Sequence, residues 1–301
     1  MTGLRLTALL PEPERGFAAA VCTALSSAGL LVRACVACAE ERGVQCLFDG
    51  DAVLARAALR AVWPRTLDLC VREDSLPRVF IADMDATLVR EECLDELAAL
   101  SGVGARVAEL TAAAMSGGMD FGTALRARIA MLAEVGVDRG LIQRTLRERI
   151  HLQAGARTLV ATLRAHGVRC ILVSGGFEDF VAPVANTLGF HAWHCNRFQF
   201  AGERIAAVCD PILGREAKLA ALQAETAALG LAAGLAIGDG ANDIPMLMAA
   251  GSGIAFHAKP AVEAVVPDRI THGDLTAVLH FLGLPERTWV TPPEGEVISA
   301  S

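Results

Sequence analysis

Two residue types are scarce in this chain of 301 residues, and their scarcity narrows the chemistry available to it. Tyrosine is absent, so no phenol can serve as acid, base or nucleophile. Of the 27 basic residues only Lys218 and Lys259 are lysines, and all the others are arginines. A sequence that uses arginine almost everywhere can keep a lysine where a compact ammonium is required, although a lysine also persists by chance.

Long uncharged apolar runs are missing too, although hydrophobic residues make up 53% of the chain and the mean hydropathy is +0.42. No window of about 18 apolar residues runs without a charge, so no membrane span is predicted. The formal net charge of −7 argues against a general nucleic-acid-binding protein, whose surface would be basic. Prolines and charged residues interrupt the N-terminal apolar stretch, which is therefore too short for a secretory signal. Without such a signal, the nine cysteines are expected to be reduced thiols in a cytoplasmic protein.

Residues 1–76 have a pattern of their own. Four short apolar runs typical of strands alternate with two segments of helical periodicity, in the order β-α-β-β-α-β. This order is typical of small ferredoxin-like α+β modules and resembles an ACT-type small-ligand domain. No ligand motif is present, so a ligand-binding role and a structural or dimerising role both stay open. Residues 73–78 are expected to be a linker.

From residue 77 to about residue 285 the sequence predicts an α/β domain. Residues from about 92 to 152 are helical in periodicity, and strands and helices alternate after them. Such alternation implies a Rossmann-like parallel sheet with right-handed crossovers, whose ligands gather at the carboxyl ends of the strands. Residues 191–208 are expected to form a hairpin or paired strands, and residues 286–301, which show little pattern, a C-terminal tail.

Four polar clusters stand out from these apolar surroundings, at predicted strand ends or near a helix start. Asp83 and Asp85 lie two residues apart after a strand, where their like charges retain a proton or recruit a cation. The triplet Ser-Gly-Gly at 174–176 offers a hydroxyl and free backbone N–H groups to a phosphate. Lys218 stands near a helix start, and the run Gly-Asp-Gly-Ala-Asn-Asp at 238–243 adds carboxylates and an amide. Taken alone, each cluster could equally be a helix cap, a turn or a solvated side chain. Two acidic clusters at strand ends of one sheet, however, predict a site for a divalent cation, most naturally Mg²⁺.

In this order the four clusters resemble the haloacid dehalogenase superfamily of phosphohydrolases, and the resemblance covers about residues 77–285. A closer resemblance is to the phosphoserine phosphatases. It rests on DMDATLVREECLDELA with Glu92, on MSGGMDFGTALRAR with Arg128, and on GDGANDIPMLMAAGSGIAFHAKP. One departure is Ala86, where serine is commoner in the first motif.

The resemblance implies a role for each acidic residue of the motifs. Asp83 would be the nucleophile that forms an aspartyl-phosphate, and Asp85 the acid that protonates the leaving oxygen and later the base for water. Mg²⁺ would be held by Asp83, the backbone carbonyl of Asp85 and Asp239, with Asp243 orienting a metal-bound water.

The resemblance also implies how substrate is bound. The groups expected to contact the phosphoryl oxygens are Ser174, the Gly175 N–H, Lys218 and Asn242. The helical segment at about 92–152 would be a cap that supplies specificity, with Glu92 pairing the substrate ammonium and Arg128 its carboxylate. Met115 and Phe121 are expected either to line the apolar side of this cap or to pack in a core.

The expected enzyme is therefore a Mg²⁺-dependent phosphatase that converts O-phospho-L-serine to L-serine and phosphate, the last step of serine biosynthesis. An alternative is a related enzyme that acts on another small phosphorylated amino acid or passes the phosphoryl group to an alcohol. A non-catalytic amino-acid sensor is a third reading, against which the complete set of motif residues weighs. A homodimer formed through residues 1–76 stays open.

Two metal-like patterns are set aside. Cys35-x-x-Cys38 lies within a predicted strand, where residues three apart face opposite sides, and no second pair accompanies it. His191 and His194 lie in the predicted hairpin, away from the acidic strand ends, and are expected to serve packing.

Overall fold

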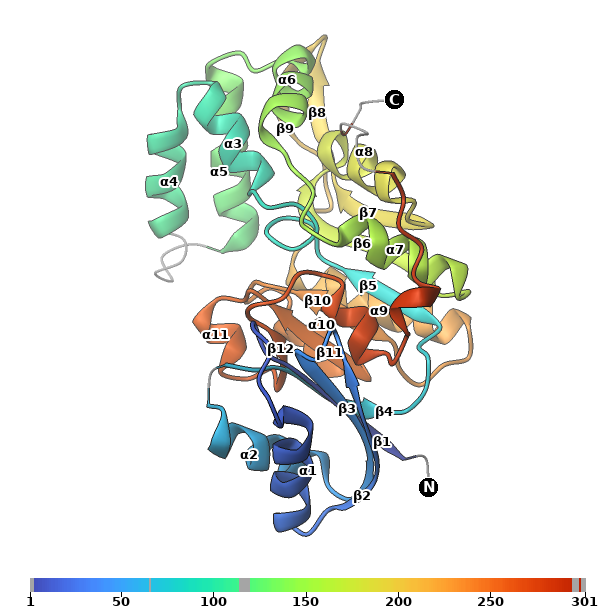
Figure 1. Ribbon diagram of the computed structural model, residues 1–301. Helices are drawn as coiled ribbons and strands as arrows, with labels where there is room; N and C mark the ends of the chain where they lie inside the picture. Colours follow the sequence, from blue (N-terminus) through green and yellow to red (C-terminus); the bar gives the residue numbers. More distant parts are fainter. Residues whose placement is uncertain (1–2, 65, 114–119, 294–297, 299–301) are drawn as a thin grey trace.

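The computed structural model describes residues 3–64, 66–113, 120–293 and 298, and Figure 1 shows their arrangement. One continuous ten-stranded sheet runs through the described residues. Its strands are, in spatial order, β2 (Leu31–Cys38), β3 (Gly43–Asp49), β1 (Leu4–Leu9), β4 (Asp68–Glu73), β12 (Asp268–Ile270), β11 (Ser252–Phe256), β10 (Leu235–Gly238), β5 (Val79–Ala82), β6 (Arg169–Phe177) and β7 (Ala192–Asn196). Within the described residues no helix is long and apolar enough to span a bilayer.

The N-terminal module contains β1 to β4 and the helices α1 (Phe17–Ser27) and α2 (Ala52–Val62). Its strands are antiparallel in the order β2-β3-β1-β4, which confirms the predicted β-α-β-β-α-β arrangement. The side chain of Asp51 caps α2 by accepting hydrogen bonds from the N–H groups of Val53 and Leu54. Both helices cover one face of this part of the sheet and enclose a core of their own.

The remaining strands form the predicted parallel sheet, in which β5 lies between β10 and β6. The helices that connect or follow these strands are α7 (Ala156–Ala165), α8 (Glu178–Leu188), α9 (Arg215–Ala228), α10 (Ile244–Ala249), α11 (Pro260–Glu263) and, after β12, α12 (Ala277–Phe281). Residues 191–208 are only in part a hairpin. β7 joins the main sheet parallel to β6, and the hairpin is β8 (Phe198–Ala201) with β9 (Arg204–Val208).

Four helices follow β5 before the chain returns to the sheet: α3 (Cys93–Leu100), α4 (Gly104–Ala113), α5 (Phe121–Glu134) and α6 (Arg139–Arg149). They agree with the predicted helical segment. Figure 1 shows them gathered at one end of the molecule, with the N-terminal module at the other. The β8–β9 hairpin supports the cap, because the N–H of Ile205 donates to the carbonyl of Val137 at 2.9 Å.

The junction between the N-terminal module and the parallel sheet is built from buried charge. β4 pairs with β12, so the two sheets are continuous where the sequence predicted only a linker. Arg56 of α2 donates to both carboxylate oxygens of Asp268, at 2.7 and 2.8 Å. The carboxylate of Asp68 accepts the N–H groups of Thr271, at 2.6 Å, and of Gly273, at 2.7 Å. These bonds tie the module to the parallel strands, because loss of either partner would leave a buried charge uncompensated.

The predicted C-terminal tail packs against the rest of the chain in its described part. Residues Glu286–Thr288 form a 3₁₀ turn, and the indole N–H of Trp289 donates to the Leu284 carbonyl at 3.0 Å. Ile298 is buried in the main hydrophobic core. The segment was unrecognisable because isolated apolar residues without periodicity give no secondary-structure signal.

Candidate active site

Parallel pairing of β5 and β10 creates the acidic end of the site. Ala82 lies beside Ile237, so Asp83 and Asp239 emerge next to each other at the carboxyl edge of the sheet. The N–H of Asp83 donates to the carbonyl of Ile237 at 3.0 Å and fixes this turn. Carboxylate oxygens of Asp83, Asp239 and Asp243 all lie within 4.8 Å of one another, and all three residues are buried. The structure therefore brings the carboxylates of Asp83, Asp239 and Asp243 together at this edge of the sheet.

Lys218 of α9 neutralises part of this charge. Its Nζ atom lies 2.7 Å from Oδ1 of Asp83 and 2.6 Å from Oδ1 of Asp243, and only 1% of the residue is exposed. Burial disfavours the ammonium, but the two carboxylates outweigh it and raise the pKa of Lys218 above its ordinary value. Lys218 is thus held charged at a fixed place beside Asp83.

Asp85 is in a different environment from Asp83. Its Oδ1 atom accepts one hydrogen bond, from the N–H of Cys93 at 3.1 Å. Burial, with the nearby charge of Glu92, raises the pKa of Asp85 to about 7. A carboxyl group with this pKa can hold a proton near neutrality and release it, which suits an acid and base.

The polar C-terminal part of β6, after Val173, forms the neighbouring wall of the pocket. Ser174 is fully buried, and its Oγ atom accepts the N–H of Gly176 at 2.9 Å. A Cβ atom at Gly176 would stand 3.1 Å from Ser174 Oγ and 3.2 Å from Asp85 Oδ2, so glycine allows the close approach. Gly175 and Asn242 also line this pocket.

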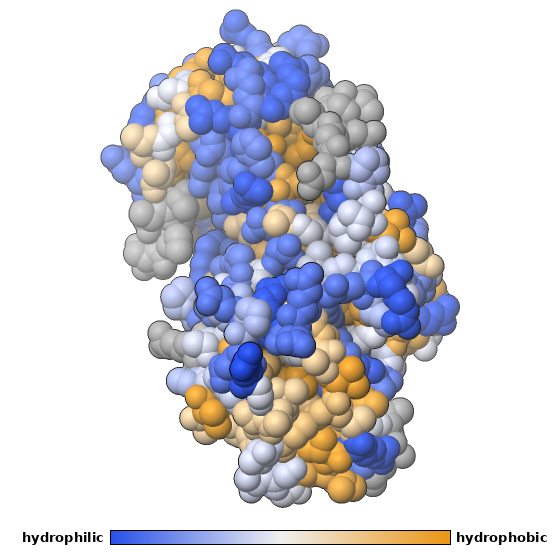
Figure 2. Space-filling view, in the orientation of Figure 1, coloured by the Kyte–Doolittle hydropathy of each residue, from blue (hydrophilic) through white to orange (hydrophobic). Residues whose placement is uncertain are grey.

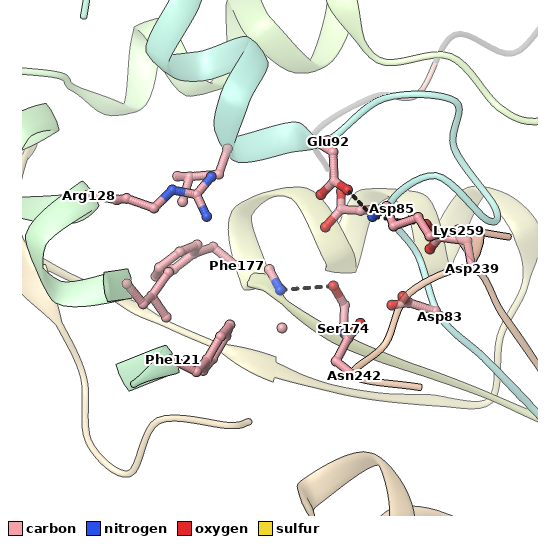
Figure 3. Close-up of a pocket in the computed structure, with 14 residues that line it drawn as sticks. Asp83, Asp85, Glu92, Phe121, Arg128, Ser174, Phe177, Asp239, Asn242 and Lys259 are labelled. Carbon is pink, nitrogen blue, oxygen red and sulfur yellow. Dashed lines mark hydrogen bonds and ion pairs between the residues drawn. The ribbon is translucent and has the colours of Figure 1, made fainter. Parts of the chain in front are cut away.

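The cap contributes the opposite wall. Figure 3 shows Arg128 and Phe121 of the cap, with Phe177 at the end of β6, facing Asp83 and Asp239 across the pocket. The Nη2 atom of Arg128 donates to the carboxylate of Asp95, while its buried Nε–H has no partner. The Phe121 ring reaches over Gly175, with its Cζ atom 3.5 Å from where a Cβ would be. Phe121 therefore lines the cap side as predicted, whereas Met115 lies outside the described residues.

Lys259 is the pocket residue that the sequence reasoning missed. Its Nζ atom lies 3.2 Å from Asp239 Oδ2 and 3.4 Å from Glu92 Oε1, so it links the acidic end of the pocket to the cap. The available signal was the scarcity of lysine, because both lysines of the chain stand beside the same acidic cluster, Lys218 at Asp83 and Asp243 and Lys259 at Asp239. Thr87, whose hydroxyl donates to Asp239 at 3.4 Å, was also not singled out for that contact.

The histidines set aside from the sequence do lie elsewhere. The Nδ1 atom of His191 accepts the N–H of Cys170 at 3.0 Å, which is a structural role.

Within the described residues the pocket combines carboxylate oxygen atoms, two ammonium groups and one guanidinium. This set can hold a hard cation and an anionic substrate with further charges of its own.

The sequence is similar to known protein families and to individual proteins. The profile of the haloacid dehalogenase-like hydrolases matches residues 80–248, and a second profile of that description matches residues 217–282. The chain is 40% identical to a phosphoserine phosphatase of Lactococcus lactis over 207 residues, which are 68% of this chain and 94% of that protein. It is also 40% identical to one of Mycobacterium tuberculosis over 210 residues, 69% of this chain but only 51% of the relative's length.

A solved structure matches almost the whole chain. It is the crystal structure of a haloacid dehalogenase family hydrolase from Salmonella enterica, with a TM-score of 0.79 and 25% sequence identity. The match covers 93% of this chain and 98% of that one, so it includes the N-terminal module as well as the parallel sheet.

Proposed function

Because the chain belongs to the haloacid dehalogenase-like hydrolases, and within them to the phosphoserine phosphatases, we propose that it hydrolyses O-phospho-L-serine to L-serine and phosphate. The observation that carries this proposal is the meeting of Asp83, Lys218 and Asp239 in one buried cluster. Phosphate monoesters react extremely slowly in water, and charge neutralisation with positioning accounts for most of their catalysis.

The acidic cluster fits Mg²⁺. Its donors are all oxygen atoms, which a hard divalent ion prefers, and in the described residues Lys218 and Lys259 are the cations beside them. Asp83, Asp239 and the backbone carbonyl of Asp85 would hold the ion, with Asp243 behind them. When bound, Mg²⁺ would neutralise negative charge on the phosphoryl oxygens.

Asp83 is proposed as the nucleophile. Its carboxylate attacks phosphorus, the bond from phosphorus to the serine oxygen breaks, and an aspartyl-phosphate forms. Asp85 gives its proton to the departing serine oxygen, then takes one from the water that cleaves the intermediate. The pKa near 7 supports this role, because the group is not locked in either protonation state.

Three sets of donors are proposed to bind the phosphoryl oxygens. Lys218 supplies an ammonium that its two carboxylate partners keep charged. The Ser174 hydroxyl and the Gly175 N–H lie in the C-terminal part of β6, and the Asn242 amide lies on the loop after β10. Donors held in place before the substrate arrives need no reorganisation as charge develops in the transition state.

Specificity for an amino acid is assigned to the cap. Arg128 has a buried Nε–H free to donate to a carboxylate, and Glu92 offers a carboxylate to an ammonium. Phe121 covers Gly175 and adds an apolar wall to the same pocket. A sugar phosphate has neither charge and would leave Arg128 and Glu92 without their substrate partners.

The N-terminal module is proposed to mediate a homodimer of this cytoplasmic enzyme. β2 is the edge strand of the sheet, and Leu31 and Val36 on it are 65% and 63% exposed. Figure 2 shows hydrophobic residues gathered over the end of the molecule where the module lies. Sedimentation of the full chain should give twice the chain mass, and a Val36→Lys variant should sediment as a monomer.

The function is tested by phosphate release from a panel of phosphoserine, phosphothreonine and sugar phosphates. We expect phosphoserine to be preferred, with release dependent on Mg²⁺ and abolished by EDTA. Added alcohols provide the second measurement. Hydrolysis leaves phosphate release equal to substrate loss, whereas phosphotransfer lowers release without slowing that loss. Absence of phosphoserine turnover with Mg²⁺ would contradict the proposal.

A further inference from the structure

Three cysteine side chains of the N-terminal module converge on one point, far along the sheet from the acidic cluster. Cys22 lies on α1, Cys35 on the edge strand β2 and Cys46 on β3. Cys35 and Cys46 are directly opposite in the antiparallel register, and α1 covers this face of the two strands. The three Sγ atoms lie within 4.8 Å of one another. Cys46 is completely buried, whereas Cys22 and Cys35 are half-buried at the rim, where solvent reaches them.

No single disulfide accounts for this arrangement. The Sγ atom of Cys35 contacts the Sγ atoms of both Cys22 and Cys46, and one sulfur atom can form only one disulfide bond. The Cα atoms of Cys35 and Cys46 are 4.3 Å apart, and those of Cys22 and Cys35 are 7.0 Å apart. The first distance is just below, and the second just above, the range of about 4.4–6.8 Å usual for disulfides. Either bond would also leave a third thiol beside it.

One bound cation, in contrast, can use all three sulfur atoms together. Zinc bonds thiolate sulfur at about 2.3 Å, and three Sγ atoms that converge on one point can surround a single ion. All the donors are sulfur, so the site selects thiophilic ions and discriminates against Mg²⁺. This chemistry separates it from the oxygen donors around Asp83.

We propose that Cys22, Cys35 and Cys46 form a trithiolate site for one thiophilic divalent cation of the zinc class. Binding forms three metal–sulfur bonds, and the thiol protons pass to the buffer, so no oxidant or reductant takes part. The bound ion ties α1 to the β2–β3 hairpin and stabilises the module. With three protein ligands the site is an exchangeable one, unlike closed structural sites with four.

Cys38 provides a matched control. It lies on the same strand as Cys35, three residues later, but it packs against the core of the parallel-sheet domain and is free. This placement also confirms that the two cysteines of the Cys35-x-x-Cys38 pattern face opposite sides of the sheet. The proposed site therefore takes one cysteine from that pattern and two from other elements.

The test is an anaerobic titration of the fully reduced full-length chain with Cd²⁺, followed by thiolate-to-cadmium charge-transfer absorption. Carboxylates give no such band, so Cd²⁺ bound near Asp83 does not interfere. We expect saturation at one equivalent for the wild type and for Cys38→Ser, and loss of that band for Cys35→Ser. We also expect one equivalent to raise the unfolding temperature of the wild type but not of Cys35→Ser. An unchanged titration in Cys35→Ser would overturn the proposal.

A second measurement needs no variant. Thiols are counted in the protein as purified without reductant, after denaturation with a chelator. A metal site leaves all nine cysteines titratable, and nine thiols with bound zinc-class metal in the native protein support the proposal. A count lower by two, with no thiophilic metal bound, would show that the cluster is a disulfide with a third thiol and would overturn it.

Discussion

The Nζ atom of Lys259 lies 3.2 Å from Oδ2 of Asp239, so the second lysine of the chain stands beside the same acidic cluster as the first. Unlike Lys218, it is half-exposed and reaches Glu92 on the cap with the same ammonium. Desolvation is more than offset by Asp239 and Glu92, which raise the pKa of Lys259 and keep it charged. It therefore competes with a metal ion for Asp239 and with a substrate ammonium for Glu92.

Replacing Lys259 with Met should consequently tighten the binding of Mg²⁺. Because the ammonium of this pair is half-exposed to solvent, the half-saturating Mg²⁺ concentration should fall only about two- to fivefold. The measurement is phosphate release as a function of Mg²⁺ concentration, and Lys259→Arg, which keeps the charge, is the control. A higher Mg²⁺ requirement in Lys259→Met would show instead that Lys259 supports the site.

Asp85→Asn should remove the proton donor for the leaving group. We expect kcat/KM for phosphoserine to fall by about 10²–10⁴-fold. The loss should be much smaller for p-nitrophenyl phosphate, whose leaving group departs without a proton. Equal losses on the two substrates would assign Asp85 a structural or metal-binding role instead.

Arg128→Ala should damage recognition of the amino acid rather than chemistry. A charge-assisted contact contributes about 1.5–3 kcal/mol, so KM for phosphoserine should rise by about ten- to a hundredfold. KM for an aryl phosphate should stay nearly unchanged. Arg126→Ala on the same helix is the matched control, because Arg126 pairs with Asp210 on the surface. A similar rise for both substrates would remove Arg128 from the recognition role.

His280 should make stability depend on pH. Burial, with the charge of Arg42, lowers the pKa of His280 to about 4, against about 6.5 for a histidine in an unfolded chain. Its Nε2 atom lies 3.5 Å from Glu286, but that partner is half-exposed and does not offset burial. Between pH 6.5 and 4 the unfolded state binds the extra proton, so stability is complete above pH 6.5 and declines as the pH falls toward 4.

A His280→Gln variant tests this directly. The wild type should lose about 2–3 kcal/mol more unfolding free energy than the variant between pH 7 and pH 4.5. Urea unfolding at the two pH values measures the difference. Parallel losses in both proteins would place the pH dependence on other groups.

Much of the fold and most of the pocket could be predicted from local pattern. Asp83 and Asp239 were placed together because parallel strands end at one edge, and Ser174 because polar residues follow an apolar run, although the structure extends β6 through Phe177. The contacts between distant segments could not be predicted. Neither the pairing of β4 with β12 nor the Arg56–Asp268 bond has a local signature, because each depends on how the two units dock.

The cysteine cluster also could not be predicted, because its members come from distant segments. The close spacing of Cys35 and Cys38 resembles a metal-binding pattern, yet the residues that contact Cys35 lie on α1 and β3. Cys46 follows only once the hairpin register is known, and Cys22 only once the helix is packed on the sheet.

The proposed mechanism depends most directly on the transfer of the phosphoryl group to Asp83. The decisive measurement is kcat of Asp83→Asn on phosphoserine at saturating Mg²⁺, with folding checked by circular dichroism. The account predicts a loss of at least about 10³-fold, because an amide cannot form the intermediate. Turnover of the folded variant at near wild-type rate would contradict it.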